Sequence, residues 1–171
     1  APPPAPLGKA ANQARTSRLV WRQQRGGNQI SASYGGVGEA RFWLGDGLAG
    51  AVRLGGGELP TMPPRGLTIE GRVASANAGQ WLDFIGGLTP ADGAAQGGDG
   101  GAGDARGLIN RVSLSIDRLD LFGTELASAR FSAAPRGRGW ELGLASPAVA
   151  GTVRLPEGYQ ARGDTPLALT V

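Results

Sequence analysis

The side chains that most often carry out enzymatic chemistry are missing from this sequence. It contains no histidine and no cysteine. Without histidine there is no Ser-His-Asp triad and no imidazole to move protons near neutral pH. Without cysteine there is no thiolate nucleophile, no disulfide and no zinc–thiolate centre. Any catalysis would therefore depend on carboxylates, arginine, tyrosine or Lys9.

Two groups of acidic residues remain as candidates for chemistry. Asp117, Asp120 and Glu125 are close in sequence, and Asp99 and Asp104 lie in a glycine-rich segment. A glycosidase needs two carboxyl groups about 5–10 Å apart across a cleft, whereas Asp117 stands on the polar side of an alternating strand pattern. The second group lacks the D-x-[DN]-x-[DN]-G spacing of a calcium loop. We therefore expect no catalytic residue, no metal site and no cofactor.

The glycine content argues against long helices. Glycine accounts for 31 of the 171 residues, well above its usual share of about 7%, and it weakens a helix wherever it lies inside one. Segment 86–107 holds almost no large apolar side chain, so we expect it to be a flexible loop. It also lacks the G-x-x-x-x-G-K-[ST] pattern of a phosphate-binding loop.

The charge is modest and gives little indication of a nucleic-acid partner. The formal net charge is +3, and Arg15, Arg18, Arg22 and Arg25 form the only dense basic group. Nucleic-acid binders usually carry a longer basic stripe. We expect no nucleic acid among the partners, and a weakly bound anionic partner stays open.

Alternating apolar and polar residues predict β-strands through most of the chain. A side-chain period of two places each apolar set on one face of a sheet, and the Gly-Gly and Gly-Asp-Gly segments between the sets are typical of hairpin turns. The fold class expected is all-β with one short helix, as a curved antiparallel sheet or β-groove of short meander strands. The apolar set of the C-terminal third consists of Val112, Leu114, Ile116, Leu142, Leu144, Val153, Leu155, Leu167 and Leu169.

The expected organisation is a linker or disordered terminus at residues 1–16, followed by a single β-rich domain at 17–171. The helix is expected at about 77–86 with Asn77 as its N-cap. The apolar positions change phase at Arg118-Leu119, which indicates a bulge or bend. The four tryptophans, Trp21, Trp43, Trp81 and Trp140, are expected to be core anchors rather than ligand platforms.

The order of several short motifs resembles a known family. G-L-T-I-E-G-R-V at 66–73 precedes Q-W-L-D-F-I at 80–85, and R-L-D-L-F-G follows at 118–123. G-W-E-L at 139–142 and S-P-A-V-A-G-T-V-R-L-P at 146–156 complete the series. This order is similar to the C-terminal region of AsmA-like proteins of the YhdP type, over about residues 17–171 with loop 86–107 excepted.

The resemblance implies a function that composition alone does not. Such proteins are periplasmic and anchored in the inner membrane, and they are associated with phospholipid movement to the outer membrane and with outer-membrane integrity. The chain would be a non-enzymatic segment of a lipid-conducting β-groove, with its membrane anchor outside this chain. Phospholipid acyl chains would be its ligands, held by the nine apolar residues named above, and envelope proteins would be further partners.

A second hypothesis stays open. The apolar faces could instead pack on each other or pair with another protein's strand. The chain would then be a structural or interaction β-domain of a cell-envelope assembly or secretion system. The two hypotheses differ in whether the apolar face of the sheet is open or covered.

Overall fold

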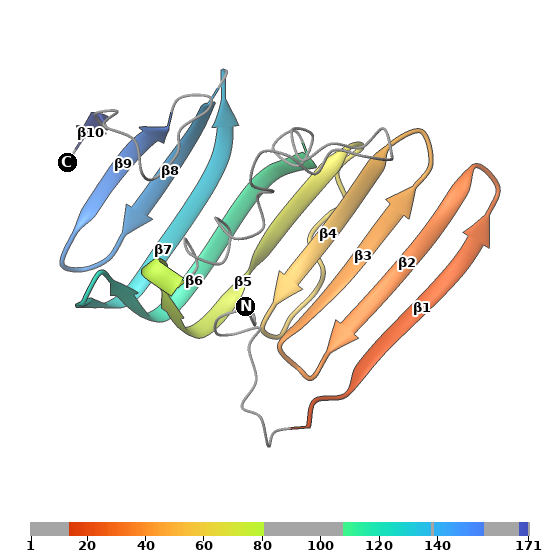
Figure 1. Ribbon diagram of the computed structural model, residues 1–171, viewed down its shortest axis with the longest axis horizontal. Helices are drawn as coiled ribbons and strands as arrows, with labels where there is room; N and C mark the ends of the chain where they lie inside the picture. The colour runs from red at the N-terminus through yellow and green to blue at the C-terminus, as the bar shows by residue number, and fades with distance from the viewer. Residues whose placement is uncertain (1–13, 81–107, 138, 156–167, 171) are drawn as a thin grey trace, which may run out of the picture.

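The computed structural model describes residues 14–80, 108–137, 139–155 and 168–170. Ten strands form one sheet whose spatial order follows the chain from β1 to β10 (Figure 1). The all-β fold class is therefore confirmed. The strands are β1 (Ser17–Gln24), β2 (Gly27–Tyr34), β3 (Gly38–Leu44), β4 (Leu48–Leu54), β5 (Gly66–Asn77), β6 (Ile109–Leu121), β7 (Thr124–Arg136), β8 (Gly139–Ala145), β9 (Ala150–Leu155) and β10 (Ala168–Thr170).

The first four strands form the expected antiparallel meander. Each pairs with the next along nearly its whole length. The turns fall where glycine was expected, and Gly26, Gly35, Gly36 and Gly47 have positive φ angles. Only glycine adopts such angles at little cost, so these turns are fixed by the sequence.

The centre of the sheet departs from an antiparallel meander. β4 pairs with β5 in parallel, and β5 pairs with β6 in parallel. Parallel neighbours need a crossover connection rather than a tight turn. The chain supplies two long connections, at 55–65 and at 78–108. Beyond β6 the pairing is antiparallel again through β10.

The expected bend near Arg118-Leu119 is confirmed by the burial pattern. Ile116 and Leu119 are both buried, at 5% and 6% exposure, although they are three positions apart, so strict alternation would place them on opposite faces. On β7 the paired residues Ala129 and Leu126 show the same spacing. Ser128, between them, has a φ of 50°, an unusual angle for a residue with a Cβ. The backbone thus turns locally and keeps both apolar pairs on one face.

The predicted helix begins where its N-cap was placed. Residues 78–80 are helical, and the Gln80 backbone N–H donates to Asn77 Oδ1 at 2.8 Å, which is the expected capping bond. The rest of that helix, loop 86–107 and most of segment 1–16 lie outside the described residues. Residues 14–16 of that first segment are described, and the Thr16 carbonyl oxygen accepts a hydrogen bond from the Gly35 N–H at 2.8 Å.

The buried core is small for so wide a sheet. Its main cluster consists of Val73, Ile116, Leu119, Leu126 and Ala129, from the neighbouring strands β5, β6 and β7. In the described part of the chain the strands contact mainly their neighbours in the sheet. Most apolar side chains outside this cluster are therefore half-buried or exposed.

Candidate functional site

A single row of apolar residues crosses the entire sheet. The register pairs each member with the next, from β1 to β10. Directly paired residues in a sheet place their side chains on the same face. We call this the central row, and it consists of Leu19, Ala32, Ala40, Val52, Ile69, Val112, Ala133, Leu142, Val153 and the backbone position of Leu169.

The row next to it has the opposite character. One residue along each strand, side chains point to the other face of the sheet. Every member of this adjacent row is polar or glycine: Arg18, Ser33, Glu39, Arg53, Glu70, Ser113, Ser132, Gly143, Thr152 and the backbone position of Thr170. The sheet thus has an apolar face, which carries the central row, and a polar face.

Ion pairs lie on the polar face. Arg53 is 3.8 Å from Glu70, and Arg154 Nε is 3.2 Å from Glu141 Oε2. Arg72 donates to Asp117 Oδ1 at 2.8 Å, so this aspartate has a structural partner. Among the described residues, no group of three or more metal-binding side chains is close enough to hold an ion.

Further apolar side chains flank the central row. Trp21, Ile30 and Phe42 follow one another in register on β1, β2 and β3. On β4 the next position is Gly50, where an added Cβ would lie 2.6 Å from Leu67 Cδ2 and 2.7 Å from Phe42 Cδ1. The two side chains therefore close over the glycine and keep the apolar surface continuous, as aromatic residues often do beside strand glycines.

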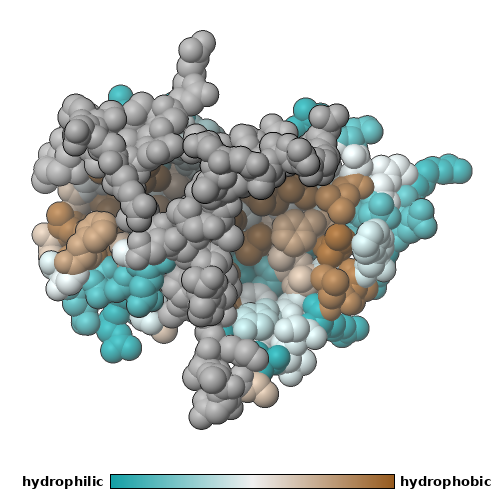
Figure 2. Space-filling view, in the orientation of Figure 1, coloured by the Kyte–Doolittle hydropathy of each residue, from teal (hydrophilic) through white to brown (hydrophobic). Residues whose placement is uncertain are grey.

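The apolar face is open at its first strands. Leu19 is 70% exposed and Trp21 is 64% exposed, although both lie on this face. Figure 2 shows hydrophobic residues gathered on the face of the sheet turned to the viewer. The described residues form one sheet, and no second described sheet covers it. Large exposed apolar patches on a folded protein usually mark a binding surface.

The structure brings most of the sequence-predicted site residues together. Val112, Leu142 and Val153 belong to the central row. Leu114 and Leu144 both pair with Phe131, two residues farther along their strands and on the same apolar face. Leu155 pairs with Trp140. Ile116 is on the same face but is buried in the core cluster, so it is the member least able to touch a ligand.

Two predicted site residues can be placed only in part or not at all. Leu169 lies in β10, where its backbone pairs with Val153. Leu167 lies outside the described residues. The binding role predicted for the whole set stays a prediction.

The sequence-based set omitted the N-terminal half of the surface. Leu19, Ala32, Ala40, Val52 and Ile69 continue the central row onto β1–β5. Their alternation was visible in the sequence. What the sequence did not show was that their phase matches that of β6–β10, because this depends on the two parallel crossovers.

The core role expected for the tryptophans is wrong for Trp21, which is largely exposed and donates from Nε1 to Asn28 Oδ1 at 3.1 Å. Trp43 pairs with Gln29 and Ala49 and therefore lies on the polar face. Trp140 is half-buried on the apolar face, and Trp81 lies outside the described residues. The tryptophans thus occupy different environments, and these can be distinguished only from the folded structure.

Comparison with known proteins identifies the family. A family model described as YhdP protein matches residues 3–170, which is nearly the whole chain. The chain belongs to the YhdP family. No match was found among the curated proteins or the solved structures.

YhdP membership confirms the resemblance seen in the motifs, and it suggests an AsmA-like protein related to lipid transport, in a family that is generally non-enzymatic. The motifs themselves occupy structural positions. The G-L-T-I-E-G-R-V motif lies in β5, and S-P-A-V forms the turn between β8 and β9. In that turn Ser146 Oγ accepts the Val149 N–H at 3.0 Å. Placement in the C-terminal region of a YhdP protein stays a prediction.

Proposed function

We propose that this YhdP-family chain is a non-enzymatic segment of a lipid-conducting β-groove in the periplasm. It carries phospholipid between the inner and outer membranes and so supports outer-membrane integrity, and a segment outside this chain anchors it to the inner membrane. The observation that carries the proposal is the central row, which crosses all ten strands without a polar residue. No helix among the described residues is long and apolar enough to cross a bilayer.

The energetics of acyl chains support this function. Each methylene exposed to water costs about 0.8 kcal/mol, so a chain of about 16 carbons costs on the order of 10 kcal/mol. Strands lie about 4.8 Å apart, so ten strands offer an apolar path of roughly 40 Å. Contact along that path removes hydrocarbon from water. Transport of this kind requires no catalytic group.

The polar face would keep the sheet soluble while lipid occupies the other face. Its exposed ion pairs contribute little to stability, because water screens them. Arg72 and Arg154, which are on this face, are paired with Asp117 and Glu141. They are therefore poor candidates for binding lipid head groups at the rim of the apolar face.

Valine-to-threonine substitutions test the proposal without changing side-chain shape. Val52, Val112 and Val153 all belong to the central row. Threonine is nearly isosteric with valine and is equally suited to strands, but its hydroxyl would face hydrocarbon without a hydrogen-bond partner, at about 1–3 kcal/mol per site. The triple variant should retain at least about tenfold less phospholipid in native mass spectrometry.

The matched control makes the reverse change on the opposite face. Thr68 and Thr152 lie on the polar face, in register with Ala51 and Gly143 respectively. The Thr68→Val/Thr152→Val variant should retain phospholipid like the unmodified chain. If the unmodified chain retains no phospholipid, or if both variants behave alike, the groove proposal fails.

The alternative, an interaction β-domain of an envelope assembly, has its own signature. The outer edge of β1 pairs with no other described strand, and such edges can accept a partner strand. In that case the chain would self-associate or bind a partner in analytical ultracentrifugation. A Val20→Lys substitution on β1 would abolish this association, and phospholipid retention would be absent from the start.

A further inference from the structure

Positive charge is concentrated at the first three strands. Between Ala14 and Leu44 there are five arginines and one glutamate, a net charge of +4. The whole chain carries only +3. The remainder of the chain is therefore close to neutral, and the net positive charge is concentrated at one end of the sheet.

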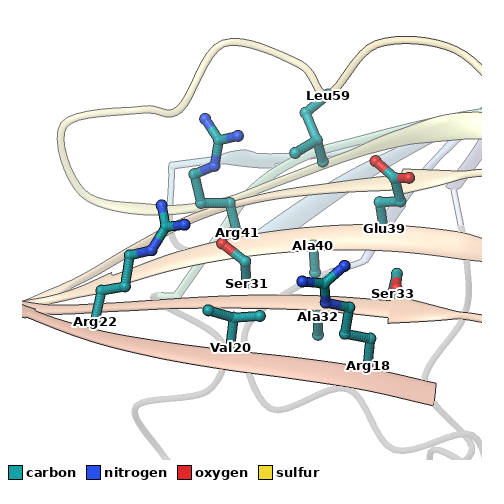
Figure 3. Close-up of a pocket in the computed structure, with 10 residues that line it drawn as sticks. All are labelled: Arg18, Val20, Arg22, Ser31, Ala32, Ser33, Glu39, Ala40, Arg41 and Leu59. Carbon is teal, nitrogen blue, oxygen red and sulfur yellow. The ribbon is translucent and has the colours of Figure 1, made fainter.

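Three of these arginines line a concavity on the polar face. It has a volume of about 270 Å³. Its polar lining residues are Arg18 and Arg22 of β1, Ser31 and Ser33 of β2, and Glu39 and Arg41 of β3. Val20, Ala32, Ala40 and Leu59, the last from the connection between β4 and β5, complete the lining. Figure 3 shows Arg22 and Arg41 extending to the same side of the sheet, toward the connection that carries Leu59. Ser31 lies on the strand between them and pairs in register with Arg41.

Among the described residues these arginines have no carboxylate partner, unlike several other arginines of the polar face. Arg53, Arg72 and Arg154 form ion pairs with Glu70, Asp117 and Glu141. No ion pair or hydrogen bond joins the side chain of Arg18, Arg22 or Arg41 to another described residue. Glu39 is the one acidic residue among the described residues that line the concavity, and Figure 3 shows it at the end away from Arg22.

The chemistry of the lining fits a phosphate group. A guanidinium presents several N–H donors in a plane and binds phosphate oxygens in pairs. Arg22 and Arg41 would supply such donors from two sides, and the Ser31 hydroxyl would add a third donor from the strand between. A carboxylate would have fewer oxygens for these donors.

We propose that the polar face of β1–β3 contains a phosphate-binding site formed by Arg22, Arg41 and Ser31, with Arg18 at its edge. The site binds a phosphomonoester or phosphodiester. It is on the face opposite the central row, so it does not rest on the proposed lipid groove. The source of the phosphate is either a phospholipid head group or a free phosphate compound.

The test uses the unmodified chain and two doubly substituted variants of equal charge. Arg22→Gln/Arg41→Gln removes the site. Arg111→Gln/Arg130→Gln removes two exposed arginines on the polar face of β6 and β7, away from the concavity. Binding of inorganic phosphate and of glycerol 3-phosphate is measured by calorimetry. Binding to vesicles is measured by sedimentation, with phosphatidylglycerol compared against pure phosphatidylcholine.

The site variant should bind roughly tenfold more weakly than the unmodified chain, as the loss of charge-assisted hydrogen bonds requires. The Arg111/Arg130 variant should bind like the unmodified chain. Binding of both soluble probes would assign the site to free phosphate compounds. Binding that requires phosphatidylglycerol vesicles would assign it to lipid head groups.

Two results would overturn the proposal. One is an unmodified chain that binds none of the phosphate probes. The other is an equal loss in both variants, which would mean that net charge alone attracts the anion. The Val52/Val112/Val153 threonine variant should keep its phosphate binding, so a failure of the lipid groove can be distinguished from a failure of this site.

Discussion

Replacing Leu19 by serine should weaken lipid binding more than it weakens the fold. Leu19 is 70% exposed, so folding buries less than a third of it. Full burial of a leucine is worth about 1.5–3 kcal/mol, so the fold gains roughly 0.5–0.9 kcal/mol from it. An acyl chain that covers the exposed part would gain about 1–2 kcal/mol, a factor of roughly 5–30 in affinity.

Two measurements separate these contributions. Urea denaturation gives the free energy of unfolding, and native mass spectrometry after lipid extraction gives the bound phospholipid. The control is Leu126→Ala, because Leu126 is only 5% exposed and belongs to the core cluster. That substitution should cost about 2–5 kcal/mol of stability. In the fraction that remains folded, it should leave lipid retention nearly unchanged.

The reasoning fails if Leu19→Ser lowers the free energy of unfolding strongly, or if it leaves phospholipid retention unchanged. A loss of more than about 2 kcal/mol in Leu19→Ser would show that another part of the protein covers the residue. Unchanged lipid retention in Leu19→Ser would show that β1 lies outside the lipid path. Either result would restrict the candidate surface to β2–β10.

Three further substitutions test how the sheet is held together. Gly71 has a φ of 156°, and an added Cβ would clash with the Leu54 carbonyl oxygen. Gly71→Ala should therefore lower the free energy of unfolding, measured by urea titration, by about 2 kcal/mol. The control Gly56→Ala should leave it unchanged, because an added Cβ at Gly56 would have nothing within 4 Å. Phe122 has a φ of 53° and is 72% exposed, so Phe122→Asn should raise stability by about 1 kcal/mol, and a lower melting temperature would contradict this. Arg72→Gln should cost less than about 1 kcal/mol, because the ion pair that it breaks is exposed, and a larger loss that persists at high salt would contradict this.

The local structure of the strands could be predicted from the sequence because the signals for it are local. Alternation fixed which residues share a face, and glycine pairs marked the hairpin turns. The N-cap at Asn77 could be predicted because capping is a local interaction: the Asn77 side-chain oxygen accepts the N–H of Gln80, only three residues ahead. Each of these features depends on residues close together in the chain.

The pairing at the centre of the sheet could not be predicted in the same way. The connections at 55–65 and 78–108 are long enough for either direction of return. Nothing in their composition shows that β4, β5 and β6 run parallel. The candidate surface was therefore assigned only to the C-terminal strands, although Val52 and Ile69 extend it through the centre.

The exposure of Trp21 also depends on information that is not local. Tryptophan is usually buried, and the sequence around Trp21 resembles that of any half-buried strand. Its exposure follows from the position of β1 at the end of the sheet, with one described neighbour. The number of neighbours of a strand is a property of the whole fold.

The strands preserve the apolar face even where the regular alternation breaks. In β6 the register shifts by one residue near its start, where Ile109 pairs with Leu67 and Arg111 pairs with Thr68. A slip of one residue normally moves every later side chain to the opposite face. Here the extra residue is Asn110, and both Ile109 and Val112 stay with apolar partners. The bulge at Asn110 therefore keeps the apolar residues on both sides of it on the same face of the sheet.

The second interruption of the alternation is the bend near Arg118, and it occurs at paired positions of the neighbouring strands β5, β6 and β7. Apolar residues three positions apart occupy the same cluster on each strand: Val73 and Ala76 on β5, Ile116 and Leu119 on β6, and Leu126 and Ala129 on β7. A bend in one strand alone would have placed polar residues such as Arg118 among apolar neighbours. Because the three strands change phase together, the apolar face continues across the bend. This cluster is a buried core rather than an exposed surface, so the shared change of phase keeps that core intact where the three strands bend.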